Sequence, residues 1–151
     1  MTDTVGSRDL EVRHATLVRS PRERVWQALT TGEGLDGWFT AGAEVDPRPG
    51  GRIVFRWRDW GVDRYTGEDA GSVLEAEPPE RFVFQWHPGG PTYATTVTLT
   101  LETVPDGTVV RVVERGFADT APGLRTLIGN ATGWGEALTL LKFRLEHGVR
   151  A

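Results

Sequence analysis

A long apolar stripe near the C-terminus constrains the fold of this chain more than any other feature of its sequence. Between residues 124 and 147, apolar side chains recur at spacings of three and four, namely Leu124, Leu127, Ala131, Trp134, Leu138, Leu141 and Leu145. This spacing predicts one α-helix about 36 Å long, at ~1.5 Å per residue, with one buried face. The preceding sequence reads mainly as short strands, so we predict a sheet that packs against this face.

Three glycines, Gly129, Gly133 and Gly135, interrupt the predicted helix. Each costs roughly 1 kcal/mol relative to alanine in a helix interior. Each also removes a side chain from the surface of the helix. We therefore predict a pocket between the helix and a curved sheet.

The N-terminal part of the chain predicts one strand followed by two short helices. The strand covers residues 10–18. Ser20 is the expected N-cap of the first helix, with Glu23 completing a capping box, and Gly32 is the expected end of this helix. Residues 33–38 predict a second, very short helix.

Alternating apolar residues then predict a series of antiparallel hairpins up to residue 115. Turns are expected at residues 49–51, 78–80 and 105–107, and the strand of residues 65–77 is expected to bend at Gly67 or Gly71. The pattern gives about seven strands in total. The inward-facing rows are predicted to be Ile53, Phe55 and Trp57; Phe82, Phe84 and Trp86; Val97, Leu99 and Leu101; and Val110, Val112 and Glu114.

Composition and charge exclude several classes of protein. The 151 residues predict one domain, over residues 10–148, after a flexible tail of residues 1–9. The net charge of −4 argues against nucleic acid as a partner. The N-terminal stretch is polar and no apolar run approaches the ~20 residues of a membrane span, so we expect neither a signal peptide nor membrane insertion. We expect a cytoplasmic protein.

Motifs for metal or nucleophilic chemistry are absent from the sequence. Cysteine is missing, and His14, His87 and His147 lack the spacing of metal ligands. Nucleophile-elbow, phosphate-loop and dinucleotide motifs are missing as well. We therefore predict no metal and no cofactor. His87, at the edge of a predicted loop, either faces solvent or reaches the mouth of the pocket.

Short motifs spread along the chain resemble one protein family. They are Val25-Trp26-Gln27-Ala28-Leu29, Gly37-Trp38-Phe39, Gly50-Gly51-Arg52, the stretch from Val73 to Phe82 with Trp86, Glu114-Arg115-Gly116-Phe117, and Gly133-Trp134-Gly135-Glu136-Ala137-Leu138. In this order, they resemble the family of activator of heat-shock-protein ATPase homologues. That family lies within the START-related (SRPBCC) superfamily, which includes the major birch pollen allergen and polyketide cyclases.

The resemblance implies an α+β helix-grip fold. In this fold a curved antiparallel sheet surrounds a long C-terminal helix, two short helices follow the first strand, and a hydrophobic cavity lies between sheet and helix. The eukaryotic co-chaperones that give the family its name carry an additional N-terminal domain for chaperone binding. A chain of 151 residues leaves no room for that domain, so we do not expect a chaperone partner.

Aromatic residues form the main candidate site. Eight of them stand at predicted inward positions, namely Trp38, Phe39, Phe55, Trp57, Phe84, Trp86, Phe117 and Trp134. Each ring belongs either to an ordinary core or to a pocket wall. A dry void of about 300 Å³ would cost on the order of 7 kcal/mol, which rivals the whole stability of a domain. The pocket is therefore expected to be small, wet or partly filled, and to suit a flat aromatic or short-chain ligand.

Glu114 is the candidate polar group of this pocket. If the alternation of its strand continues, its carboxylate faces inward beside Phe117. A buried carboxylate needs a partner. We favour an ion pair with Arg115 or Arg81. The alternative is a polar anchor or general base at the pocket mouth, with Tyr65 as a second polar group.

Two aromatic residues in predicted loops, Trp60 and Tyr93, suggest either a lid or a contact between two copies in a homodimer.

We predict a non-catalytic protein that binds a small hydrophobic or aromatic molecule. The alternatives are an enzyme similar to polyketide cyclases and aromatases, and an interaction protein that modulates a chaperone ATPase. No residue is assigned as catalytic. The predicted ligand-binding residues are Trp38, Phe39, Phe55, Trp57, Tyr65, Phe84, Trp86, Glu114, Phe117, Trp134 and Leu138.

Overall fold

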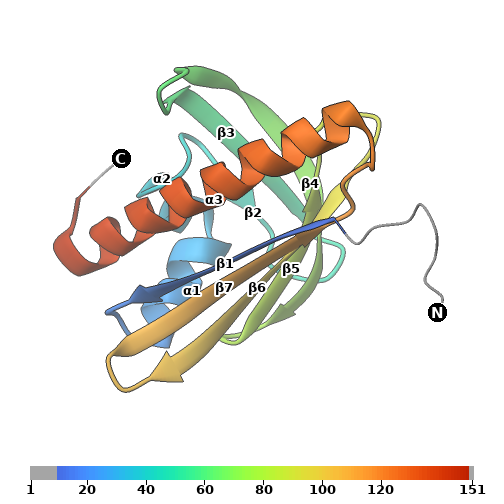
Figure 1. The fold of residues 1–151 in the computed structure, drawn as a ribbon. Coiled ribbons are helices and arrows are strands. Elements are labelled where there is room, and N and C mark those ends of the chain that lie inside the picture. The colour runs from blue at the N-terminus through green and yellow to red at the C-terminus, as the bar shows by residue number, and fades with distance from the viewer. Residues whose placement is uncertain (1–9, 150–151) are drawn as a thin grey trace, which may run out of the picture.

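An antiparallel sheet of seven strands forms the body of the computed structural model, which describes residues 10–149 (Figure 1). The strands are hydrogen-bonded in the order β1-β7-β6-β5-β4-β3-β2. The predicted tail of residues 1–9 lies outside the described residues. The strands are β1 (Glu11–Val18), β2 (Glu44–Val45), β3 (Arg52–Trp60), β4 (Tyr65–Glu77), β5 (Arg81–Trp86), β6 (Thr95–Val104) and β7 (Gly107–Arg115).

Three helices complete the described fold and confirm the predicted helix-grip arrangement. Helices α1 (Arg22–Thr30) and α2 (Gly32–Asp36) follow β1, and α3 (Ala121–His147) follows the last strand. Figure 1 shows α3 running diagonally across the face of the curved sheet, with α1 beneath its C-terminal end. Two short helices after the first strand and one long final helix are the elements that the sequence predicts.

The start of α1 differs from the prediction. Pro21, not Ser20, is the N-cap, and no side chain caps this helix. Ser20 is instead held at the end of the sheet, because its carbonyl accepts a hydrogen bond from the Thr108 hydroxyl at 2.8 Å. The carbonyl of Pro21 accepts the first helical bonds, from the amides of Arg24 and Val25.

The junction between α1 and α2 also differs, because Gly32 begins the second helix instead of ending the first. Thr31 separates the two helices with an extended backbone, and its side chain accepts the Gly34 amide as the cap of α2. Gly32 is required here for space. A Cβ atom at this position would lie 2.2 Å from the carbonyl oxygen of Ala43.

Helix α3 begins three residues before its predicted start. Thr120 caps it by accepting the Gly123 amide, and Gly148 ends it with a left-handed φ of 71°. Trp134, Leu138 and Leu141 of the predicted stripe are buried, but Ala131 is exposed. Ala131 lies at one edge of the predicted stripe. The face of α3 that is actually buried is rotated away from Ala131 and includes Ala137.

Strand β4 is irregular at Leu74, and its pairing with β3 also shifts beside Gly67, where Trp57 pairs with Gly67 and Trp60 with Tyr65. The predicted bend at Gly67 or Gly71 stays a prediction. The pairing between β4 and β5 shifts by one residue between Val73 and Glu75. Gly71 allows the close approach of β5, since a Cβ atom there would lie 1.8 Å from the carbonyl oxygen of Gln85. The bulge at Leu74 reverses which residues of β4 face the helix.

The core fills the space between the sheet and the helices. The predicted inward rows of β5, β6 and β7 are buried throughout, and on β3 Ile53 and Phe55 are buried while Trp57 is partly exposed. None of the helices in the described part of the chain is both long and apolar enough to cross a membrane.

The Glu146 carboxylate connects the C-terminal end of α3 to the end of β1. Glu146 Oε2 accepts hydrogen bonds from Lys142 Nζ at 2.8 Å and from the Arg19 amide at 2.8 Å. Lys142 Nζ also donates to the Leu17 carbonyl at 2.9 Å. Burial acts to raise the pKa of the Glu146 carboxyl, but the bonds from Lys142 and Arg19 together outweigh it and hold this pKa below its ordinary value of 4.5.

Gly71 and Gly67 provide a matched test of strand approach. We expect Gly71→Ala to lower the free energy of unfolding by about 2 kcal/mol, because the new methyl group meets backbone that cannot move aside. Gly67→Ala meets the hydroxyl end of the exposed Tyr65 side chain, which can rotate away. Its effect should stay below about 1 kcal/mol. Urea denaturation measures both, and equal effects would contradict this account of β4.

The Glu146 contacts predict a pH dependence of stability. A carboxyl whose folded pKa lies below 4.5 stabilises the fold above that pH, and its contribution is lost as the pH falls through the folded value. Glu146→Gln should therefore lower the free energy of unfolding by about 1 kcal/mol at pH 7. The difference from the wild type should vanish in acid. Glu136→Gln, an exposed change on the same helix, is the control, and a pH-independent Glu146→Gln difference would refute the assignment.

Candidate functional site: an aromatic groove beneath the C-terminal helix

A groove with a volume of about 620 Å³ lies between the sheet and the N-terminal half of α3. Its rim includes the exposed residues Tyr65, Pro91 and Gly129, so the groove is open to solvent. Because solvent reaches the groove, the energetic cost that the sequence analysis assigned to a dry, enclosed void does not apply to it.

Aromatic rings form one connected wall of this groove. Phe39, in the loop after α2, stands at its centre. The centroid of its ring lies 5.5 Å from that of Trp57, 5.4 Å from that of Trp60 and 6.3 Å from that of Trp134. Trp86 continues the wall at 5.7 Å from Trp134. Rings at these separations attract one another beyond the burial of their area.

Two glycines of α3 leave the opposite wall open. Gly129 and Gly133 both line the groove, and a Cβ atom at either position would meet no atom within 4 Å. Both therefore lower the groove wall as the sequence predicts. Gly135 does not line the groove, since it faces His14 on β1, whose Cε1 atom would lie 3.9 Å from an added Cβ.

Glu114 lies behind the aromatic wall, fully buried, and receives hydrogen bonds from four side chains. Trp86 Nε1 donates to Oε2 at 2.8 Å, and Thr95 Oγ1 donates to it at 2.5 Å. Trp134 Nε1 donates to Oε1 at 2.9 Å, and Asn130 Nδ2 reaches both oxygens at 2.9 and 3.0 Å. These donors come from β5, β6 and α3, so one carboxylate connects the sheet to the helix.

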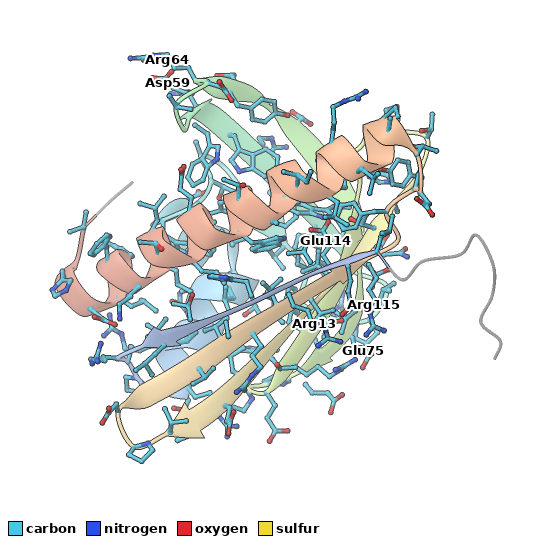
Figure 2. The ribbon with its side chains drawn as sticks, viewed as in Figure 1. Arg13, Asp59, Arg64, Glu75, Glu114 and Arg115 are labelled. Carbon is cyan, nitrogen blue, oxygen red and sulfur yellow. The ribbon has the colours of Figure 1, made fainter. Side chains whose placement is uncertain are left out.

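The expected ion pair of Glu114 with Arg115 or Arg81 is wrong. Arg115 pairs with Glu11 at 2.8 Å and Arg81 with Glu75 at 3.2 Å. The reason is strand alternation, which turns both arginines to the opposite face of the sheet. Figure 2 shows Glu114 on the side of α3, whereas Arg115 and Glu75 lie on the far side of the sheet.

The donors around Glu114 suit an anchor for the groove walls. Indole and amide groups donate hydrogen bonds here, and a carboxylate only accepts them, so the match is complete. Both oxygens are already occupied by protein donors. This geometry favours a positioning role, in which Glu114 holds Trp86, Trp134 and Asn130 at the groove.

The predicted ligand-binding residues separate into two groups. Those that line the groove are Phe39, Trp57, Tyr65, Trp86 and Trp134. Those buried in the core outside the groove lining are Trp38, Phe55, Phe84, Glu114, Phe117 and Leu138. Trp38, for example, turns toward α1 and donates its indole N–H to the Ala28 carbonyl at 3.0 Å.

Trp60 lines the groove, whereas Tyr93 is not one of its lining residues, and their predicted role as a lid or a dimer contact stays a prediction. Trp60 is partly buried and belongs to the groove wall. Tyr93 packs within its own loop, where an added Cβ at Gly89 would lie 2.3 Å from its hydroxyl. The Tyr93 hydroxyl is buried and has no hydrogen-bond partner among the described residues.

Polar residues that sequence reasoning missed also line the groove. Asn130 lies on α3, and Asp69 on β4 contacts His87, whose imidazole Nδ1 is 3.0 Å from Asp69 Oδ1. A signal for Asp69 exists, because Tyr65, Gly67, Asp69, Gly71 and Val73 alternate along one face of β4. Within residues 10–149, no cluster of three His, Asp or Glu side chains could hold a metal ion.

The fold and the groove define a helix-grip protein. The sequence model of the family described as "Activator of Hsp90 ATPase homolog 1-like protein" matches residues 19–146. The chain belongs to this family. No curated protein sequence matches it.

Solved structures of relatives share the fold along nearly the whole chain. SSP2350 from Staphylococcus saprophyticus is 26% identical with a TM-score of 0.75, over 93% of this chain and 95% of that one. The Aha1 dimer from Colwellia psychrerythraea is 25% identical with a TM-score of 0.73, over 91% and 97%. DynU16, from the dynemicin biosynthetic locus, is 22% identical with a TM-score of 0.79, over 95% of this chain and 49% of that one.

The Glu114 contacts predict a large loss of stability for a small change. Glu114→Gln replaces an acceptor oxygen by an amide that faces donors, so we expect the free energy of unfolding to fall by about 3 kcal/mol. The fluorescence of Trp86 and Trp134 should change with it. Glu102→Gln, an exposed change on β6, should have an effect below about 0.5 kcal/mol. An unperturbed Glu114→Gln protein would contradict the anchoring role.

Proposed function

We propose that the protein binds a small hydrophobic or aromatic molecule in the groove between the sheet and α3. The observation that carries this proposal is the juxtaposition of a connected aromatic wall with two glycines that face open space. Groove-facing glycines in a helix cost stability, whereas aromatic walls suit a flat ligand. Their combination supports a site kept open for a ligand.

The size of the groove supports a ligand of one to three rings. A ligand that buries about 250 Å² of apolar surface gains roughly 6 kcal/mol at ~25 cal/mol per Å². That energy corresponds to a Kd between about 1 µM and 1 mM. Asn130, Tyr65 and the Asp69–His87 pair are polar groups at the groove that would orient such a ligand.

An acid–base enzyme is the second candidate, and one observation favours it. His87 and Asp69 are titratable, contact each other and line the same aromatic groove. Titratable groups beside an apolar wall are what a cyclase-like or isomerising reaction needs.

We also propose, from a solved relative, that the protein assembles into a homodimer. The Aha1 protein of Colwellia psychrerythraea was solved as a dimer. In this chain, Val62 and Tyr65 at the β3–β4 hairpin are exposed apolar residues. They are the residues to examine at such an interface.

A groove-filling variant separates binding from stability. We expect Gly133→Leu to raise the free energy of unfolding by about 1 kcal/mol, because leucine is the better helix former. Its side chain would occupy the groove and lower ligand affinity at least about tenfold. Gly135→Ala should gain similar stability with no loss of affinity, since Gly135 lies outside the groove.

Native mass spectrometry before and after organic extraction identifies a co-purified ligand. Tryptophan fluorescence titration with bicyclic aromatic compounds then measures affinity for the wild type and both variants. Ligand binding that survives in Gly133→Leu would refute the groove as the site.

A further inference from the structure

One wall of the groove carries a histidine oriented by a carboxylate. We propose that His87 and Asp69 form a general acid–base pair that moves protons on an enolisable aromatic ketone bound in the groove. This inference rests on the proposed binding function and adds a reaction class to it. His87 is the catalytic residue, and Asp69 is the positioning residue.

The hydrogen bonds determine the state of the imidazole. Asp69 Oδ1 lies 3.0 Å from His87 Nδ1, and Asp69 Oδ2 accepts the His87 main-chain N–H at 2.6 Å. A carboxylate accepts but does not donate, so Nδ1 carries the proton of the neutral ring. Nε2 then holds a lone pair that can accept another proton. The same division of roles operates in hydrolase triads, where a carboxylate orients a histidine base.

Strand geometry explains why these two residues meet. Asp69 is opposite Phe55 on β3, in the row of β4 residues that faces the groove. It is on this face because the bulge at Leu74 reverses the alternation of β4. His87 follows the last residue of β5, and the close approach of β4 to β5 at Gly71 brings it to Asp69.

A purely structural role of Asp69 explains only one of its two contacts with His87, the hydrogen bond to the main-chain amide. The regular pairing of β4 with β5 ends at Ser72 and Gln85, and Asp69 Oδ2 satisfies the next free amide, that of His87. The second oxygen, however, is used for the imidazole and not for the backbone. The side chains of Asp69 and His87 remain 18% and 34% exposed, and both residues line the groove.

Few other charges face this pair. Among the described residues that line the groove, none is a lysine or an arginine, and α3 contributes the neutral Asn130. Glu68 on β4 also lines the groove and lies 3.7 Å from Arg56. The loop after β5 contributes Pro88 and Pro91, and Tyr65 stands at the rim. Among the described residues that line the groove, His87 is therefore the side chain with both a hydrogen-bond donor and an acceptor nitrogen for proton transfer.

The proposed step needs no oxidant, reductant or co-reactant beyond water. The Nε2 lone pair of His87 removes a proton from a carbon next to the ketone. The electrons of that C–H bond form a C=C bond, and the carbonyl π electrons move to oxygen, which gives an enolate. Return of the proton from the imidazolium restores the ketone. In D₂O the imidazolium exchanges with solvent, so carbon-bound hydrogen is replaced by deuterium.

Hydrogen–deuterium exchange of 2-indanone, a bicyclic aromatic ketone, tests this step. Exchange followed by proton NMR should be at least about tenfold faster with the wild-type protein than with an equal concentration of imidazole. His87→Gln should reduce it to background while 2-indanone still quenches tryptophan fluorescence. Asp69→Asn should slow exchange at least about tenfold and shift its pH profile, because the amide no longer selects the tautomer. His14→Gln, a surface histidine on β1, should change nothing.

The outcomes distinguish this inference from the proposed function. If 2-indanone binds but exchanges no faster than with imidazole, the acid–base pair is refuted and the binding function stands. Failure of 2-indanone and the other bicyclic compounds to bind would refute both. Unchanged exchange in His87→Gln or Asp69→Asn would also overturn the pair. Thermal unfolding verifies that each variant folds.

Discussion

The buried carboxylate of Glu114 is the interaction on which the rest of the site depends. A carboxylate with no exposed surface is stable only when its oxygens accept hydrogen bonds. Here the donors belong to two strands and to α3, so satisfying Glu114 requires sheet and helix to be docked in one arrangement. The same bonds fix two tryptophans whose outer faces form the groove wall. A polar requirement in the core thus determines the shape of an apolar site.

The open volume of the groove has a cost in the stability of α3, because glycines occupy two helical positions that face it. Gly129 and Gly133 together cost roughly 2 kcal/mol relative to alanine in a helix interior. Neither glycine is required by a close contact, since an added Cβ would meet open space at both positions. Gly32 and Gly71 differ, because backbone of a neighbouring segment leaves no room for a side chain there. Glycines thus serve two opposite purposes in one fold, close packing at the strands and open volume at the helix.

The groove is chemically asymmetric, and this asymmetry links the two proposals. Aromatic rings from β3, β5 and α3 supply burial, whereas polar atoms gather where β4 meets the loop after β5. A flat ligand bound against the rings would place one edge toward Asp69 and His87. In the two proposals, binding and proton transfer use the same volume: the rings would provide affinity and the imidazole would provide reactivity.

Most of the fold follows from patterns that are local in the sequence. The stripe from Trp134 to Leu141 determines a helix with one buried face, and strand alternation places Glu114 inward, because both periodicities are properties of neighbouring residues. Family motifs add the order of the elements. These patterns and motifs were enough to predict five residues that line the groove, namely Phe39, Trp57, Tyr65, Trp86 and Trp134.

Contacts between distant strands were decided by the tertiary structure alone. The partners of Glu114 lie between 16 and 28 residues away, and no local pattern distinguishes them from an arginine. The pairing of Asp69 with His87 depends on one extra residue at Leu74, which shifts the strand register and selects the face on which Asp69 lies. Sequence by itself determined which elements form and which faces are apolar. Register, and with it the polar chemistry of the groove, was settled only when the strands paired, because a shift of one residue reverses every side chain beyond it.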